Sequence, residues 1–504
     1  MLLWVFAHFF RRLSLAKFYS DPNCLYAPAM SESQPHTARP PSVAHAALCF
    51  GVIILIIGIG LFRYAIDLHS LMFFCLLWTG LNARLLGYRY AQLREQIALA
   101  IGRALPAIYI FILIGMVIAS FMHSGTVAVL MYFGLDWLSP GSFLAVGMLL
   151  CAIMSLATGT SWGTVGTLGV VFIGIGGAMQ IPLPLVAGMI VCGATFGDKL
   201  SPISDTTNLA AMSADTTLYR HIYSMMFTTA PTFLLSLIIF AVIGMAYGGQ
   251  DFASNDIEQI RVALAESYRL SPFICLLPII VLATLSVKRV PAEVTMAMSV
   301  VTAVVIAILY QGGSTVDVLN ALWANTPGTT GIASLDDLLG RGGISSMSWT
   351  LMLALMALAL GGMLHGSGFL NALLAGIVSR IQRVPTLIAT TIGSGLLGNM
   401  AMGEAYVSII LNCQLFRPHY KKAGLDPAVL SRSVEEGSTL TTGLIPWTTA
   451  GAFYTATLGV PVLDYVPYAF FNYTNAIVSV VMAALGIGLL KRIKPVMQTA
   501  IDQQ

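Results

Sequence analysis

Long apolar segments follow one another along most of this chain, separated by short polar stretches. Segments such as residues 45–62, 104–122, 223–247 and 466–490 have the roughly 20 apolar residues that a helix needs to cross a lipid bilayer. Glycine and proline are spread through these segments, as transmembrane helices tolerate and soluble helices do not. The pattern therefore predicts an all-α polytopic membrane protein.

The composition points the same way. Of the 504 residues, 57% are hydrophobic and 9% are charged, whereas about 25% are charged in an average soluble domain. A formal net charge of +3 is too small to suggest nucleic-acid binding. The seven cysteines occur singly, without the spacing of a zinc site or a disulfide framework. The sequence contains no recognisable pair of nucleophile and base and no phosphate loop, so we expect neither an enzyme nor a resident cofactor.

The N-terminal segment, residues 1–44, departs from this pattern. Met1–Phe10 is apolar, but Arg11 and Arg12 follow it instead of preceding it, and no small-residue cleavage site comes after. A secretory signal has the opposite arrangement. We therefore expect a disordered cytoplasmic segment, with translation beginning at either Met1 or Met30.

A second copy of the polar motifs recurs at a constant offset of 244 residues. The pairs that share this spacing are Gly159 with Gly403, Gly193 with Gly437, and Pro202 with Pro446. Each pair interrupts an apolar stretch, which makes a chance match improbable. Residues 104–247 and 348–490 are therefore predicted to be two copies of one unit.

Charges in the loops predict that the two copies cross the membrane in opposite directions. Cytoplasmic loops collect Lys and Arg. Four arginines between residues 84 and 103 precede the first copy, whereas the loop before the second copy, 312–347, holds three Asp and one Arg. The final helix of the first copy ends at Asp251, and that of the second ends at the basic residues 491–494. Inverted repeats with broken helices are typical of secondary transporters, whose binding sites lie near the bilayer midplane.

The predicted fold has about ten spanning helices and two re-entrant hairpins, with both termini in the cytoplasm. Two spans precede the first copy and two more, 271–287 and 291–310, link the copies. The predicted layout is a cytoplasmic segment (1–44), two leading helices (45–103), repeat 1 (104–247), linking helices with an external loop (248–347), inverted repeat 2 (348–490) and a cytoplasmic tail (491–504).

The densest polar cluster is residues 193–210, GATFGDKLSPISDTTNLA, within an otherwise apolar stretch. Gly197 and Pro202 frame residues that cannot continue a helix smoothly, because Pro202 lacks an N–H and restricts Ser201. Ser204 or Asp205 is a natural N-cap for a new half-helix. Unwound backbone at membrane depth is tolerated only where it is buried in protein or lines a cavity.

Oxygen-bearing side chains in this cluster predict a cation site, because hard cations prefer oxygen ligands. Burial disfavours the charged form of an Asp, so one carboxylate can hold either a proton or Na⁺. The residues expected to bind the ion or couple it to a proton are Asp198, Ser201, Asp205, Thr206, Thr207, Asn208 and Glu404, with Na⁺ at Asp198, Ser201 and Asp205. The structural alternatives are a helix cap for Asp205 and an ion pair with Lys199 for Asp198. Asp205 is expected to matter most, because it begins a half-helix.

The tips of the two predicted hairpins add polar side chains to the same region. Glu404 in the second tip takes the place of Thr160 in the first, and is the only acid between residues 385 and 416. The second broken helix has threonines where the first has Asp198 and Asp205. The expected cation or substrate pathway comprises Thr158, Gly159, Thr160, Ser161, Asn399, Thr442, Thr448 and Thr449.

The cluster GATFGDKLSPISDTTNLA, with the preceding TGTSWGTVGTLG and the later glycine and hydroxyl segments, resembles the NhaC family of Na⁺/H⁺ antiporters. The resemblance extends over most of residues 45–490. It implies the inverted-repeat architecture of the ion transporter superfamily and an elevator-like alternating-access motion. The family includes relatives that exchange small carboxylates, such as malate and lactate, with Na⁺ and H⁺.

The leading hypothesis is exchange of Na⁺ for H⁺ across the lipid bilayer of a bacterial inner membrane. The alternative is Na⁺-coupled transport or exchange of a small organic acid or an amino acid, with its carboxylate at the half-helix N-termini 160–164 and 404–408. A channel is less compatible with inverted repeats, which predict two alternating gates. The sequence leaves the H⁺:Na⁺ ratio and the formation of a homodimer open.

Overall fold

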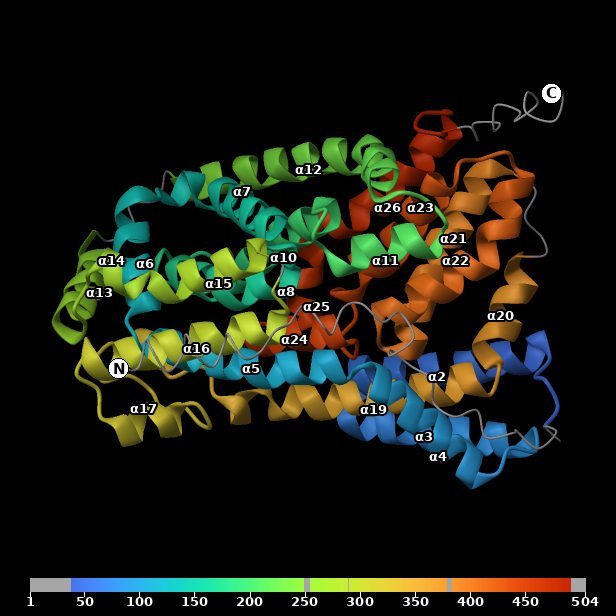
Figure 1. The fold of residues 1–504 in the computed structure, drawn as a ribbon, viewed down its shortest axis with the longest axis horizontal. Helices are drawn as coiled ribbons and strands as arrows, with labels where there is room; N and C mark the ends of the chain where they lie inside the picture. Colours follow the sequence, from blue (N-terminus) through green and yellow to red (C-terminus); the bar gives the residue numbers. More distant parts are fainter. Residues whose placement is uncertain (1–37, 249–253, 289, 379–382, 491–504) are drawn as a thin grey trace, which may run out of the picture. The chain divides into compact units, whose positions relative to one another are not determined.

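The computed structural model describes residues 38–248, 254–288, 290–378 and 383–490, which form helices and loops with no strand among them (Figure 1). The all-α prediction is confirmed for these residues. Seven described helices are long and apolar enough to cross a membrane, or eight if the bent pair at residues 90–123 is one span. Expectations for residues 1–37, for Asp251 and for the tail 491–504 lie outside the described residues.

Among the described residues, three helices precede the first copy, where the sequence predicted two membrane spans. They are α2 (Val43–Tyr64), α3 (Leu68–Leu85) and α4 (Tyr90–Arg103). The additional helix, α4, reads YAQLREQIALAIGR, so a search for apolar segments does not detect it. It packs against α19 (Ser348–Gly366) of the second copy.

The first copy and the linking region follow in chain order. The first copy contains α5 (Leu105–His123), α6 (Thr126–Trp137), α7 (Pro140–Thr158), α8 (Ser161–Thr164), the π-helix η2 (Val165–Gly169), α9 (Val170–Ala178), α10 (Leu183–Leu200), α11 (Asp205–Ser213) and α12 (Leu218–Gly248). The linking region contains α13 (Ser254–Ser267), α14 (Pro272–Cys275), α15 (Leu277–Val287), α16 (Ala292–Leu309), α17 (Thr315–Ala321), α18 (Ala333–Leu339) and η3 (Ile344–Met347).

The second copy has a similar order of elements. After α19 it contains α20 (Phe369–Val378), α21 (Val384–Met402), α22 (Ala405–Lys422), α23 (Pro427–Thr442), α24 (Thr449–Leu458), α25 (Val462–Tyr465), η4 (Val466–Tyr468) and α26 (Phe470–Ala484). In the first copy α7 packs along α10 and α12, and in the second α21 packs along α23 and α26.

Both hairpins turn at a glycine in the left-handed region. Helix α7 ends at Gly159, with φ of 70°, and α21 ends at Gly403, with φ of 66°. Residues with a Cβ are strained in this region, whereas glycine adopts it freely. The next helix starts two residues later in each case, so the tip is a single tight turn between two helices.

A second glycine pair explains how closely the broken helices approach the hairpins. A Cβ atom at Gly193 on α10 would lie 2.4 Å from the carbonyl oxygen of Met148 on α7. A Cβ atom at Gly437 on α23 would lie 2.3 Å from the carbonyl oxygen of Ile392 on α21. Both distances are far below van der Waals contact, so these positions exclude any larger residue without a shift of backbone.

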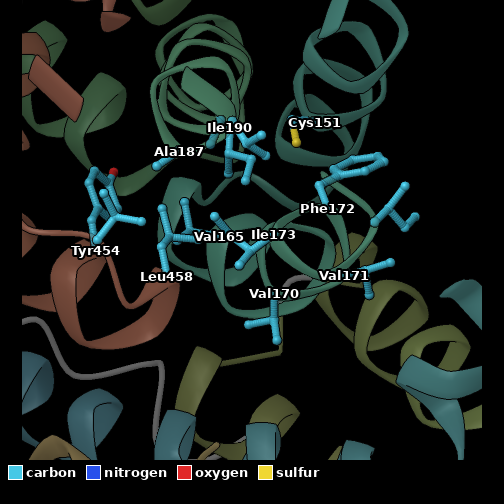
Figure 2. Packing of buried hydrophobic residues seen from close by; sticks show 14 of the residues in the cluster. Cys151, Val165, Val170, Val171, Phe172, Ile173, Ala187, Ile190, Tyr454 and Leu458 are labelled. Atoms are coloured by element: carbon cyan, nitrogen blue, oxygen red, sulfur yellow. The ribbon is translucent and has the colours of Figure 1, made fainter. Parts of the chain in front are cut away.

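Apolar side chains fill the space between the first hairpin and its neighbours (Figure 2). Phe172 and Ile173 of α9 belong to the same buried cluster as Ile190 of α10, Cys151 of α7 and Leu458 of α24. The two arms of the hairpin, α7 and α9, therefore pack against each other and against α10 and α24. The π-helix η2 lies within the second arm, and such bulges are frequent at functional sites.

The break in the first broken helix is shorter than the sequence predicted. Gly197 lies inside α10, which continues through Leu200, so its expected place at the edge of the break is wrong. Pro202 disfavours a helical backbone only at the residue before it, and Ser201 is accordingly extended, with ψ of 126°. Ser204 is the N-cap of α11, and Asp205 is its first helical residue.

Candidate functional site

A cavity of about 1040 Å³ lies among the ends of the four helices that the two breaks create and the tips of both hairpins. Most of the polar residues predicted from the sequence line it. These are Thr158, Gly159, Thr160, Ser161, Asp198, Asp205, Thr206, Asn208, Glu404, Thr442 and Thr449. The two broken helices and the two hairpins, distant in sequence, therefore meet at one site.

Asp198 joins the first broken helix to the first hairpin tip. Its Oδ2 accepts a hydrogen bond from the Ser161 hydroxyl at 2.6 Å and from the Ser161 backbone N–H at 3.1 Å. The side chain is buried, and its second oxygen, Oδ1, has no hydrogen-bond partner within the protein. Thr160 caps the short helix α8 by accepting from the Gly163 N–H at 3.3 Å, which fixes the backbone that holds Ser161.

Asp205 joins the first copy to the second. Its Oδ1 accepts from the Thr206 backbone N–H at 2.8 Å, and its Oδ2 accepts from the hydroxyl of Tyr406 at the start of α22. The accessible surface of Asp205 faces the cavity. Tyr406 was not predicted as a site residue, because a tyrosine that follows a turn in an apolar stretch usually indicates hydrophobic packing.

Glu404 caps α22 and contacts the second broken helix. Its Oε2 accepts from the Thr449 hydroxyl at 2.9 Å, and its Oε1 accepts from the Tyr406 backbone N–H at 3.4 Å. The Thr449 backbone N–H in turn donates to the Gly403 carbonyl at 2.9 Å. The second hairpin tip and the start of α24 are therefore held together by both side-chain and backbone contacts.

Asp198, Asp205 and Glu404 bring negative charge together at the cavity, whose lining also includes Glu293, Arg103 and His365. Asp205 is close enough to Asp198 and to Glu404 to interact electrostatically with both. None of the three forms an ion pair with Lys, Arg or His in the described ranges. Like charges in a poorly solvated site repel strongly, so the arrangement favours a bound cation or proton.

Three buried oxygen atoms of the broken helices at the cavity wall lack a hydrogen-bond partner within the protein. They are Asp198 Oδ1, Thr439 Oγ1 and Thr442 Oγ1, the last two near the end of α23. Buried polar atoms are nearly always partnered, and an exception calls for a water or an ion. One carboxylate and two hydroxyls are the kind of oxygen donors that a hard monovalent cation accepts.

The described residues contain no group of three or more His, Cys, Asp or Glu close enough to hold a metal ion together. A cation at this site would therefore need hydroxyl or carbonyl oxygens as well as a carboxylate. Such a mixed shell suits Na⁺, whereas Zn²⁺ prefers imidazole and thiolate ligands.

Several predicted ligands face away from the cavity. The Ser201 hydroxyl donates to the Leu156 carbonyl at 2.8 Å, and Thr207 contacts Glu435 instead of the cavity. Asn399 donates to the Ser438 carbonyl at 2.6 Å, and Thr448 caps α24 by accepting from Gly451 N–H at 3.1 Å. These four residues do not line the cavity, so their hydrogen bonds stabilise the backbone near the breaks and the hairpin tips instead.

The remaining predicted residues at the lining use their side chains partly for local bonds. The Thr158 hydroxyl donates to the Met154 carbonyl at 2.9 Å, and the Asn208 amide donates to Ser204 O at 2.6 Å. The Thr206 hydroxyl contacts that of Ser204 at 3.1 Å. These bonds hold the hairpin arm and the first turn of α11.

The structural alternative for Asp198, an ion pair with Lys199, is wrong. Lys199 points the other way, with its Nζ 3.1 Å from Asn475 Oδ1 and 3.9 Å from Glu436 Oε1. Adjacent residues on a helix do not face each other. Sequence analysis thus missed a second buried group of ionisable side chains behind the cavity wall, which includes Lys199 and Glu436.

Comparison with known proteins gives matches over most of the chain. A family model described as the Na⁺/H⁺ antiporter family matches residues 193–487. The chain is 35% identical over 451 residues to the Na⁺/H⁺ antiporter NhaC of Alkalihalophilus pseudofirmus, covering 89% of this chain and 97% of that protein.

Two other relatives are named for different substrates. The arginine/ornithine antiporter ArcD of Halobacterium salinarum is 33% identical over 449 residues, covering 88% of this chain and 92% of that protein. The malate-2H⁺/Na⁺-lactate antiporter of Bacillus subtilis is 33% identical over 388 residues, covering 77% and 83%. Relatives at this level of identity therefore differ in what they carry.

Proposed function

The chain belongs to the Na⁺/H⁺ antiporter family, and we propose that it exchanges Na⁺ for H⁺ across a membrane by alternating access. The observation that carries this proposal is the group of Asp198, Asp205 and Glu404, which line one cavity and form no ion pair within the described ranges. Buried charges in membrane segments are costly and usually functional. A site that is neutralised by either Na⁺ or protons, and not by both together, couples the two ions.

Asp198 is the central Na⁺ ligand in this proposal, with its free Oδ1 and the hydroxyls of Thr439 and Thr442. Asp205 and Glu404 flank it, and Tyr406 and Thr449 hold them by hydrogen bonds. When the cation leaves, a proton on one of these carboxylates removes the repulsion between them. Na⁺ is the cargo here, and the chain needs no resident cofactor for this exchange.

A second candidate is exchange of a small organic acid or amino acid, which the cavity of about 1040 Å³ is large enough to hold. The observed contacts disfavour it at the half-helix N-termini. The Ser161 N–H already donates to Asp198, and the Tyr406 N–H to Glu404. A substrate carboxylate there would face two protein carboxylates, so we favour the inorganic cation.

Everted membrane vesicles test the two candidates. With an imposed ΔpH and no organic solute, addition of Na⁺ should dissipate the gradient, and vesicles from cells without this protein should show no such response. The measurement is the fluorescence of a ΔpH-sensitive dye. Dissipation that begins only after malate, lactate or arginine is added would contradict simple Na⁺/H⁺ exchange and favour the second candidate.

We also propose that residues 104–247 and 348–490 are inverted repeats with re-entrant hairpins, in a fold of about ten spans in a bacterial inner membrane with both termini in the cytoplasm. The paired turns at Gly159 and Gly403 and the paired breaks support the repeat. The loop charges support the inversion, because Lys421 and Lys422 end α22 whereas Asp464 lies near the start of α26. Inversion would make the half-helix ends converge near the midplane.

Accessibility of single cysteines tests the inversion. In a background without the seven native cysteines, Asp464→Cys should react with an impermeant thiol reagent in intact cells. Lys421→Cys should react only after the membrane is opened. Both native side chains are exposed in the structure, so a negative result would not reflect burial. Labelling of position 421 from outside would reverse the second hairpin and remove the role proposed for Glu404.

A further inference from the structure

A second group of buried ionisable side chains lies behind the cavity wall and has no part in the cation site described above. We call Lys199, His221, Glu435 and Glu436 the rear cluster. All four are 0% exposed, and none lines the cavity. They come from three helices, α10, α12 and α23. Since burial of charge at membrane depth is costly, such a cluster calls for a function.

The contacts of His221 accommodate two protonation states. Its Nε2 lies 2.6 Å from Glu435 Oε2, and its Nδ1 lies 2.7 Å from the Ser431 hydroxyl. The Ser431 hydroxyl also reaches the Ala428 carbonyl at 3.1 Å. A hydroxyl has one hydrogen. In both states an Nε2–H donates to Glu435. If the Ser431 hydroxyl donates to Ala428, its oxygen accepts from an Nδ1–H as well and the imidazole is charged; if the hydroxyl donates to Nδ1, the imidazole is neutral. Neither state requires a heavy atom to move.

The charges that face this pair nearly cancel. The ionisable groups that interact electrostatically with Glu435 are Lys199 from α10, Asp205 from α11 and Cys413 from α22. Arg432 and Glu436 share α23 with Glu435, and Tyr420 from α22 interacts with these two. The neighbouring helix α26 contributes Asn475, which does not titrate. Lys199 and Arg432 are positive and Glu435, Glu436 and Asp205 are negative, so this group of charges sums to −1 when His221 is neutral. An added proton brings the sum to zero.

Thr207 connects the rear cluster to the proposed cation site. Its Oγ1 lies 3.3 Å from Glu435 Oε1, 3.1 Å from the Lys199 carbonyl oxygen and 3.3 Å from the Asp198 carbonyl oxygen. Thr207 belongs to the first turn of α11, two residues after Asp205. Glu435 lies one helical turn before Thr439, which lines the cavity. The two sites thus share α10, α11 and α23.

We propose that the His221–Glu435 pair is a second proton-binding centre of the exchanger, coupled to the cation site through Thr207. This inference rests on the proposed Na⁺/H⁺ exchange. As one Na⁺ leaves the cavity, one proton binds a cavity carboxylate and a second proton enters the pair from water, so two protons are exchanged for each Na⁺ and the two sites together gain one positive charge. A proton at the pair compensates the negative charge of the cavity carboxylates after the cation has left. Rebinding of Na⁺ makes that proton unfavourable, and it is released.

His221→Gln and Glu435→Gln test this proposal, because each keeps hydrogen-bonding atoms in place and removes a titrating group. In everted vesicles, we expect the pH of half-maximal Na⁺-driven exchange to shift by about one unit or more in both variants, where one unit is a tenfold change in proton affinity. In purified protein in weak buffer, the protons released per Na⁺ bound should fall by about half. The double variant should show no larger effect than either single variant.

The control is His123→Gln, at a part-buried histidine with a single side-chain partner, Asn325 Oδ1 at 2.9 Å. It should leave the pH profile and the proton release unchanged. A wild-type profile and wild-type proton release in both rear-cluster variants would overturn the proposal. Absence of Na⁺-driven exchange in the wild-type protein would instead refute the proposed function itself.

Thr207→Val provides a test in case the rear-cluster variants do not fold, because it preserves side-chain shape and leaves both titrating groups in place. We expect it to lower the proton release per Na⁺ bound by about half, since the pair no longer senses the cation site. Release equal to that of the wild-type protein would exclude the connection through Thr207.

Discussion

Asp198→Asn should lower the rate of Na⁺-driven proton movement by about 100-fold while the protein still reaches the membrane in normal amounts. The substitution keeps the size of the side chain and an oxygen that accepts from Ser161, so α8 and α10 stay together. It removes the negative charge of the carboxylate that contains the free Oδ1. It thereby also removes a group that can bind either Na⁺ or a proton. A charge-assisted contact contributes about 1.5–3 kcal/mol, and each 1.4 kcal/mol is about a factor of ten.

The measurement is Na⁺-dependent dissipation of ΔpH in everted vesicles, normalised to the amount of protein in the membrane. Asp215→Asn is the matched control. Asp215 is exposed, pairs with Arg417 at 2.5 Å and has φ of 60°, a conformation that Asn also accepts. It should retain normal exchange. Exchange at the wild-type rate by Asp198→Asn would remove this residue from the site.

Asp205→Asn should have a smaller effect than Asp198→Asn, which reverses the order expected from the sequence. Both oxygens of Asp205 already accept hydrogen bonds, from Tyr406 and from the Thr206 backbone. An amide oxygen can keep the bond from Tyr406, so α11 and α22 stay connected. Asp198 has an oxygen without a partner, and no neighbour replaces its charge.

The fold class could be predicted from the sequence, because the length of an apolar segment and the positions of glycine and proline determine the backbone of that segment directly. Gly159 and Gly403 mark the hairpin turns, and Pro202 marks the end of α10 to within two residues. The extra helix α4 was missed, because its polar residues make it too hydrophilic for an apolar-segment search. The number of spans remains a prediction, since helices such as α26 are shorter than a full crossing.

Residues at the breaks could be predicted, whereas residues on the buried helices could not. Asp198, Asp205 and Glu404 lie at turns or helix ends, where local sequence restricts where the side chain can point. Helix α23 is buried on every face from Ala428 to Thr442. Polar residues are spread along it and all of them are buried, so its sequence does not indicate which residues face the cavity and which face α12. This is why Thr439 and the contact of Glu435 with His221 appear only in the structure.

Lys199→Met should reduce the amount of folded protein severely, because it leaves two buried glutamates with one basic partner fewer. Lys199 interacts electrostatically with Glu435 and Glu436, and all three are fully buried. Removal of one partner of a buried ion pair costs about 3–5 kcal/mol. Total stabilities are typically about 5–15 kcal/mol, so this loss is a large share. The measurement is the detergent-solubilised, monodisperse fraction and its thermal unfolding midpoint.

The double variant Lys199→Met/Glu436→Gln separates charge balance from packing. It removes one positive and one negative charge, so the net charge of the rear cluster is unchanged, and we expect most of the folded protein to return. Lys422→Met, at an exposed position at the end of α22, should behave like the wild-type protein. If the double variant is as unstable as Lys199→Met, the defect comes from the loss of the contact with Asn475 on α26. Charge balance would then not explain why α10 carries a lysine directly after Asp198, and the charge compensation proposed for the His221–Glu435 pair would lose its basis.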